Sequence, residues 1–224
     1  MAIAFDTFTN GGSFVTTTTR TFSHTSSGSD RIAFVFAGVP NPNDIVTGIT
    51  YAGVAMTKIA SIEQPDPGLR WVSFWYIIAP ATGAQDVVIT CSSAPDAMDG
   101  ACCSYTGAKQ TGQPDAFATN TSASTTSLTT SVTTVADNCW TIICGRGGVN
   151  AVAGTGMTSR GILATDNTTI IGDSNADLTP AGSKSLQITS DSGAYGVVMA
   201  SFSPAVATTT EPINRGSALL GVGQ

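Results

Sequence analysis

The sequence predicts an all-β protein: an antiparallel β-sandwich, jelly-roll-like, with an extended C-terminal arm. Apolar residues make up 42% of the chain, enough for a core, and charged residues only 11%, so threonine and serine must cover most of the surface. The 24 glycines and 10 prolines are spread along the 224 residues, and no stretch offers a long helical pattern. Short strand patterns rich in Thr, Val and Ile alternate with turn residues, which is typical of a sandwich rather than of βαβ units.

The first half is expected to contain seven strands, over residues 14–22, 31–38, 46–51, 54–62, 69–79, 85–91 and 100–105. Apolar residues fill both alternating sets of positions in 31–38 and 69–79, so both faces of these two strands should be buried. A hairpin is expected to turn at Ala52-Gly53. Residues 107–123 are expected to form a long connection.

The second half repeats this pattern, with strands expected over residues 124–134, 138–145, 158–164, 168–172, 183–189 and 194–203. Residues 86–90 leading into 100–105 resemble residues 185–189 leading into 196–202. The Thr-rich and apolar strands before Gly38 likewise match the pair before Gly145. Two similar halves that fold into two facing sheets would suit a jelly roll with two Greek keys. The alternative is chance, because amphipathic strands resemble one another.

The chain is expected to form one domain over residues 1–204, because sandwiches commonly reach this length as a single unit. Residues 205–224 form the predicted arm: Thr-Thr-Thr-Glu-Pro reads as a linker, and apolar residues then lie between glycines. A tail that is merely solvated would be more polar, so the arm is predicted to dock on a neighbouring subunit or partner. The alternative is that it packs on its own domain or stays disordered. Its predicted contact residues are Ile213, Arg215, Leu219, Leu220 and Val222.

Charge and hydropathy exclude two classes of partner. Nine basic residues are scattered among fifteen acidic ones, for a net charge of −6, and a nucleic-acid groove would need a clustered positive surface. No run of eighteen apolar residues occurs, and residues 1–6 lack the pattern of a secretory signal. We therefore expect no nucleic-acid partner, no membrane span and no export by a secretory leader.

The cysteines are expected to be core-filling thiols of a protein made in a reducing cytosol. They are Cys91, Cys102, Cys103, Cys139 and Cys144. Adjacent strand residues point to opposite faces, so Cys102 and Cys103 cannot share a metal. A disulfide from Cys91 to Cys102 or Cys103 is the alternative.

Nothing in the sequence predicts an enzyme or a cofactor. His24 is the only histidine and has no recognisable partner motif, and neither G-x-S-x-G nor H-E-x-x-H occurs. Only Glu63 and Glu211 are glutamates, one beside a proline-containing segment and one in the arm, which disfavours a glycosidase.

Three weaker candidates have a plainer interpretation. Asp166, Asp173 and Asp177 could hold calcium, but the glycine and glutamate of an EF-hand loop are missing, so solvated turn carboxylates are expected. The aromatic residues of 71–76 could stack on a sugar, but their apolar surroundings favour the core; they are Trp71, Trp75 and Tyr76. The glycine-rich turn around Arg146 precedes no helix, which disfavours a phosphate loop.

Three segments carry a family resemblance: residues 48–57 (GITYAGVAMT), 75–83 (WYIIAPATG) and 104–107 (SYTG). They resemble the β-sandwich virion proteins of tailed phages that serve as capsid decoration proteins or appendages. The resemblance implies a bacteriophage virion structural protein made in the host cytoplasm, most simply a decoration (cement) protein. Its partners would be capsid or other virion proteins, with a homo-oligomer also possible. The alternatives are a carbohydrate- or receptor-binding module of a fibre or adhesin, and a subunit of an extracellular filament.

Overall fold

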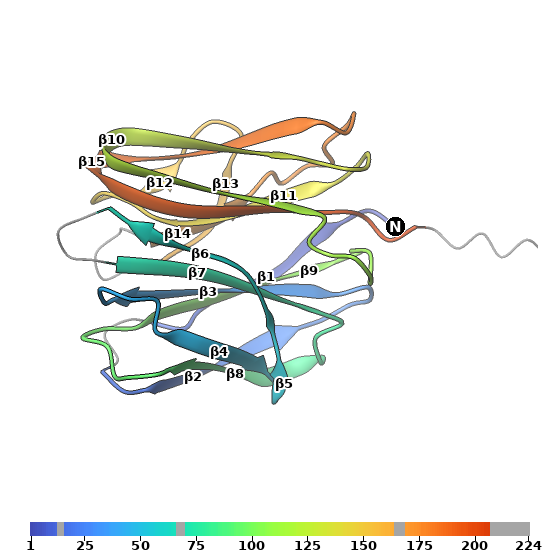
Figure 1. Ribbon diagram of the computed structural model, residues 1–224. Helices are drawn as coiled ribbons and strands as arrows, with labels where there is room; N and C mark the ends of the chain where they lie inside the picture. The colour runs from blue at the N-terminus through green and yellow to red at the C-terminus, as the bar shows by residue number, and fades with distance from the viewer. Residues whose placement is uncertain (13–15, 66–69, 164–168, 207–224) are drawn as a thin grey trace, which may run out of the picture.

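The computed structural model describes residues 1–12, 16–65, 70–163 and 169–206, and all its strand pairings are antiparallel (Figure 1). This confirms the predicted all-β sandwich. The strands within these residues are β1 (Ala4–Asn10), β2 (Thr19–Ser26), β3 (Ile32–Pro40), β4 (Val46–Tyr51), β5 (Val54–Ala55), β6 (Thr57–Gln64), β7 (Arg70–Ile78), β8 (Gly83–Cys91), β9 (Asp99–Thr106), β10 (Ala116–Thr133), β11 (Trp140–Arg146), β12 (Val152–Ala153), β13 (Thr158–Leu163), β14 (Thr169–Asp173) and β15 (Ser183–Phe202).

The strands form three sheets rather than the two expected from the sequence. The middle sheet has the order β1-β9-β3-β7-β6, the outer sheet β2-β8-β4-β5, and the C-terminal sheet β10-β15-β11-β14-β13, with β12 paired to β15. Figure 1 shows the middle sheet stacked between the other two. The middle sheet is covered on both faces because β3 is apolar on both: Ala33 and Val35 face one core, and Phe34 and Phe36 the other.

The two halves of the chain have the same strand order, as the sequence similarity between them predicted. The long strands β10 and β15 each correspond to two strands of the first half. Residues 116–122 of β10 pair with residues 195–201 of β15, and residues 127–133 pair with residues 183–189. The later part of β15 pairs with β11 and its earlier part with β12. The order β10-β15-β11-β14-β13 then repeats β1-β9-β3-β7-β6, and the remaining parts repeat β2-β8-β4. Each half is therefore jelly-roll-like by itself, whereas we expected the halves to form one jelly roll together.

Several strands differ from the sequence-based expectation. Strands β1 and β12 were not predicted, and residues 116–123 belong to β10 instead of a connection. Residues 54–62, expected as one strand, are divided between β5 in the outer sheet and β6 in the middle sheet. Strand β15 is continuous where two strands were expected. Strand β2 begins at Thr19, while residues 14 and 15 lie outside the described part of the chain.

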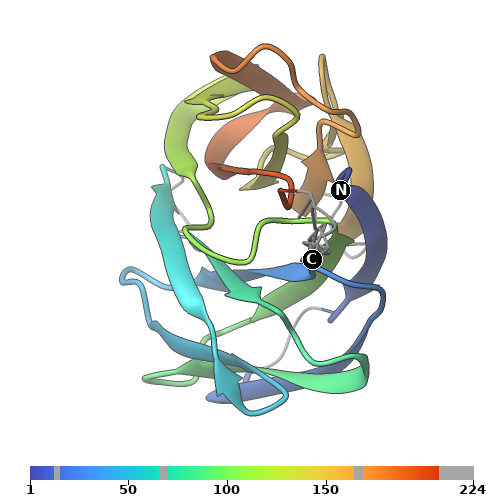
Figure 2. The same ribbon diagram turned by 90° about the vertical axis from the view of Figure 1, so that its right-hand side faces the viewer.

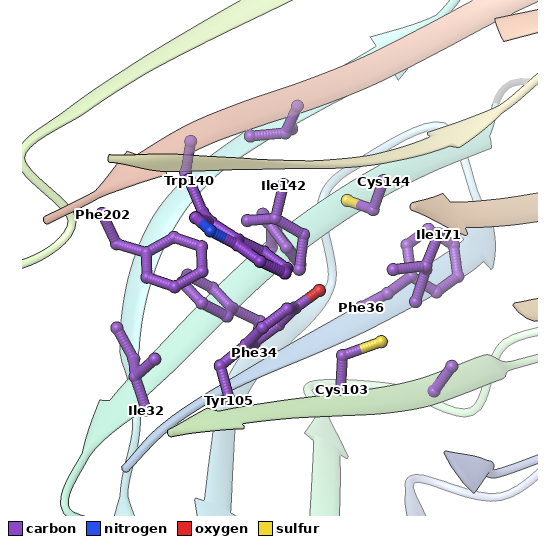
Figure 3. Packing of buried hydrophobic residues seen from close by; sticks show 14 of the residues in the cluster. Ile32, Phe34, Phe36, Cys103, Tyr105, Trp140, Ile142, Cys144, Ile171 and Phe202 are labelled. Atoms are coloured by element: carbon purple, nitrogen blue, oxygen red, sulfur yellow. The ribbon is translucent and has the colours of Figure 1, made fainter. Parts of the chain in front are cut away.

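One hydrophobic core joins the two halves, between the middle and C-terminal sheets (Figure 3). Tyr105 pairs with Ile32 in the first half, and Phe202 pairs with Trp140 in the second, so Tyr105 and Phe202 hold corresponding positions. Their ring centroids lie 5.1 Å apart. Corresponding residues thus meet at the centre of this interface core, as they do in a two-fold symmetric dimer.

The edges of the interface follow the same symmetry. Strand β1 contacts β13, and β10 contacts β6, so the first strand of each half lies against the edge strand of the other. The register of β6 shifts at Ile59 and that of β13 at Arg160, which are corresponding positions. The chain therefore resembles a two-fold dimer of jelly rolls in one polypeptide.

Strands β9 and β15 end beside the N-terminus. The Met1 amino group donates a hydrogen bond to the Ala205 carbonyl (2.8 Å), and the Ala205 amide donates to the Gly107 carbonyl (2.7 Å). We call this end, marked by Met1, Gly107 and Ala205, the terminal face; it is the side turned toward the viewer in Figure 2. Both halves contribute to it.

Candidate functional site

The predicted contact residues of the arm all lie outside the described residues, so their contacts stay a prediction. They are Ile213, Arg215, Leu219, Leu220 and Val222. The structure does describe the base of the arm, up to Val206, whose side chain is 81% exposed. The arm therefore leaves from the terminal face.

A pocket of about 330 Å³ lies beside this base. Its lining comes from separate parts of the chain: Met1, Ala2, Asn138, Asp177, Pro204 and Ala205. The alanines and the proline form an apolar side, and an amide and a carboxylate supply polar groups. No local sequence motif links the segments that line this pocket, so it could not be predicted from the sequence.

The polar groups of the pocket are held by hydrogen bonds. The Asn138 backbone N–H donates to Thr179 Oγ1 (3.1 Å), and the Thr179 hydroxyl donates to the side-chain Oδ1 of Asn138 (2.8 Å). Asp177 Oδ1 accepts a hydrogen bond from the indole nitrogen of Trp140 (2.9 Å), which packs in the interface core. The pocket is thus anchored to the packing between the two halves.

Asp173 is fully buried, so the expectation that it is a solvated turn carboxylate was wrong. Arg160 donates to it from Nε (2.6 Å) and Nη2 (2.9 Å), and the Tyr105 hydroxyl donates to Oδ2 (2.7 Å). The Asn175 amide also donates to Oδ1 (2.9 Å). Tyr105 belongs to the first half and the other partners to the second, so this cluster links the halves.

The surroundings of the cluster explain why the charges stay paired. The Arg160 guanidinium lies 4.2 Å from the centre of the Phe5 ring. Burial lowers the pKa of Arg160, but hydrogen bonding to Asp173 and its charge outweigh burial, and the net shift is upward. Burial raises the pKa of the Tyr105 hydroxyl well above its usual value, so it stays a donor.

The alternative calcium site gains no support from this arrangement. The Asp173 oxygens are occupied by protein donors, and Asp166 lies outside the described residues. Within the described part of the chain, no group of three His, Cys, Asp or Glu side chains is placed to hold a metal ion.

A second buried ion pair also links the halves. Arg146, which was expected in a glycine-rich turn, is the last residue of β11; it donates from Nη1 to Asp99 Oδ2 (2.5 Å), and both side chains are more than 90% buried. Asp99 lies at the start of β9 in the first half. The end of β11 thus directs this cation inward.

His24 is buried and lies apart from the pocket. Its Nδ1 is 2.8 Å from Thr9 Oγ1. The neighbouring carboxylate, Asp6, accepts hydrogen bonds from the Ser27 and Ser104 hydroxyls instead (2.6 and 2.7 Å). The hydroxyl that contacts His24 is thus that of Thr9, while the two serine hydroxyls donate to Asp6.

Because the fold buries His24 in its neutral form, the protein should become less stable in acid. Burial lowers the pKa of His24 to about 4, against 6.5 in the unfolded chain. Above pH 6.5 both states are neutral; as the pH falls toward 4 only the unfolded state gains the proton, which destabilises the fold by about 3 kcal/mol. Urea unfolding of wild type and His24→Gln between pH 7 and 4 should show a smaller pH dependence in the variant. If the free energy of unfolding changes equally with pH in the two proteins, His24 is not the source of the acid sensitivity.

The cysteines are buried and free, as the main interpretation predicted. Cys102 and Cys103 face different cores, which confirms that they point to opposite sides of β9. Burial raises the pKa of Cys91 to about 11 and that of Cys102 well above its usual value, so these thiols stay protonated. The alternative disulfide is not formed.

The aromatic residues considered for sugar stacking lie inward. Trp75 is 6% exposed, and Trp71 and Tyr76 pack against the cores at partial burial. Among the described residues, the aromatic side chain with an exposed ring is Phe117, at 57% exposure. It lies in the segment that we expected to be a connection.

Comparison of the chain with protein-family models, with curated proteins and with solved structures found no match. The described residues contain no helix that could cross a membrane. The fold and the pocket therefore define the class: a jelly-roll-like β-sandwich with a small polar pocket at the base of an arm.

Proposed function

We propose that the protein is a bacteriophage virion structural protein of the capsid-decoration type, made in the host cytoplasm, which binds the capsid exterior without catalysis. The observation that carries the proposal is the terminal face, where both halves, a pocket and the base of an arm come together. An arm beside a rigid body is a common way for a subunit to reach a neighbour.

The fold is compatible with this role but does not establish it. Jelly rolls occur in viral capsid proteins and in lectins, so the site must decide between assembly and sugar binding. Sugar platforms need exposed aromatic rings, but Trp75 is buried, Trp71 and Tyr76 pack against the cores, and Phe117 is a single exposed ring among the described residues. This favours assembly over the carbohydrate-binding alternative.

The surface is also suited to contact with other proteins. The outward positions of β2 carry Thr19, Thr21, Ser23 and Thr25, all exposed and uncharged. The corresponding part of β10 exposes Thr129, Ser131 and Thr133. A surface of this kind can pack against a protein with little cost from desolvated charge.

Removal of residues 207–224 should abolish or strongly weaken binding to the capsid. The proposed contact residues are lost, while the described sheets stay intact. The measurement is co-sedimentation of purified protein with particles that lack it, using a chain with a scrambled arm of the same composition as control. Full binding by the truncated chain would remove the arm from the proposal. Binding to a glycan array, abolished by Phe117→Ala, would favour the sugar-binding alternative instead.

A further inference from the structure

We infer that the core of the first half binds one internal water molecule through His24 Nε2, Ser26 Oγ and the Tyr51 hydroxyl. The site lies between the outer and middle sheets, because all three side chains are buried on the inner face of the outer sheet. It uses no residue of the arm or of the pocket, so it can be tested independently of the proposed function.

Three polar side chains meet in this core without protein partners for their polar atoms. His24 and Ser26 are each 1% exposed, and Tyr51 is fully buried. Within the described part of the chain, His24 Nε2, Ser26 Oγ and the Tyr51 hydroxyl have no hydrogen-bond partner. A buried polar atom that stays unpaired destabilises a fold, and native proteins satisfy such atoms with protein groups or with ordered water.

The three side chains come from two strands that flank β8 in the outer sheet (Figure 1). His24 and Ser26 are two residues apart on β2, so they point to the same face, and Tyr51 ends β4. The rings of His24 and Tyr51 meet edge to face, with centroids 6.0 Å apart. Burial raises the pKa of Tyr51 to about 12, while the neighbouring Ser26 hydroxyl acts in the opposite direction. The three groups therefore converge over β8.

The second half shows that the fold does not require a polar side chain at the position of His24. His24 and Val132 correspond, because each pairs with the residue just before one of the two similar segments, 86–90 and 185–189. Val132 is apolar and packs in the core of the second half. The polar group in the first half is therefore a property of this sequence and not of the fold.

The hydroxyls at the next inward position also differ between the halves. Ser26 corresponds to Thr134, which lies two residues after Val132. The Gly182 amide donates to Thr134 Oγ1 (3.0 Å), and the Thr134 hydroxyl donates to the Gly182 carbonyl (3.2 Å). Ser26 Oγ makes no such bond to Gly83, the residue that pairs with Ser26. Its hydroxyl is thus left for a partner inside the core.

A water molecule has the chemistry that these three atoms need. Buried waters typically make about three hydrogen bonds to polar atoms that the protein itself does not satisfy. Burial lowers the pKa of His24 to about 4, so its ring is neutral at pH 7 and Nε2 donates or accepts according to the tautomer. Hydroxyls and water can both donate and accept, so one water satisfies all three atoms with either tautomer. It thereby joins β2 to β4 across β8.

The direct test is a high-resolution crystal structure of the full-length protein at pH 7. We expect one ordered water at about 2.6–3.2 Å from His24 Nε2, Ser26 Oγ and the Tyr51 hydroxyl oxygen. Direct hydrogen bonds among these three side chains, or close packing with no density between them, would overturn the inference.

A stability measurement distinguishes a bound water from unpaired groups. Tyr51→Phe removes a hydrogen bond to the water, so the equilibrium constant for unfolding in urea should rise about threefold to tenfold at pH 7. Tyr195→Phe is the matched control: this tyrosine is equally buried, and its hydroxyl is hydrogen-bonded directly to Ser190. The two variants should lose similar stability. If Tyr51→Phe is as stable as wild type or more stable, the hydroxyl had no partner and the inference fails.

The double variant Tyr51→Phe/Ser26→Ala tests whether the two hydroxyls share one water. Either single substitution already weakens the binding of that water, so the second should have a smaller effect than it has alone. The fold-change of the double variant should therefore be less than the product of the two single fold-changes. A result equal to that product would contradict a shared water molecule.

Discussion

Replacement of Asp173 by asparagine is expected to lower the free energy of unfolding by about 3–5 kcal/mol. The carboxylate is fully buried and accepts hydrogen bonds from Arg160 and Tyr105. Asparagine has a similar shape but no charge, so it leaves the Arg160 cation buried without its counter-ion. The loss therefore reports the cost of an unpaired buried charge rather than a change of packing.

Urea unfolding at pH 7 measures this effect. Asp86→Asn, which removes an exposed carboxylate on β8, is the control and should change stability by no more than about 0.5 kcal/mol. If the free energy of unfolding of Asp173→Asn lies within about 1 kcal/mol of that of wild type, the cluster does not hold the two halves together as we describe.

Truncation of Phe202 to alanine should also lower the free energy of unfolding by about 3–5 kcal/mol, because it opens a cavity in the interface core. The Phe202 ring lies 5.1 Å from that of Tyr105 and 5.3 Å from that of Phe34, both from the first half. Because this core is shared, the loss should destabilise both halves and not the second alone.

Calorimetry distinguishes the two cases. We expect one transition at a lower temperature for Phe202→Ala, and almost no change for Phe117→Ala, whose ring is 57% exposed. The expectation of a single domain over residues 1–204 stays a prediction that this experiment tests. Two separate transitions in the wild-type protein would show that the halves unfold independently.

Buried strands could be predicted from the sequence because their signal is local. Strand β3 alternates aromatic and aliphatic residues that now face two cores. The turn of the β4–β5 hairpin was predicted at Ala52-Gly53, and both residues have positive φ (51° and 79°), which a tight hairpin turn requires.

Edge strands and the layer number could not be predicted in the same way. Strand β1 and the first part of β10 are half exposed and rich in threonine, so their composition resembles that of a loop. The number of sheets depends on strand pairing: the first half forms two separate sheets, whereas the long strands β10 and β15 join the corresponding parts of the second half into one.

The partners of the site residues are distant in sequence. Tyr105 donates to Asp173, 68 positions away, and Trp140 donates to Asp177, 37 positions away. A solvated turn was therefore a reasonable expectation for Asp173 from its neighbours alone. The pocket at the base of the arm depends on the same long-range pairing and has no local signal.

Electron cryomicroscopy of the intact source particle tests the proposed role most directly. We predict regularly spaced density on the capsid exterior into which the pair of jelly-roll-like halves fits, with the terminal face turned toward a neighbouring subunit. Purified particles that lack the protein, or that carry it at no ordered position, would contradict the assignment to the virion.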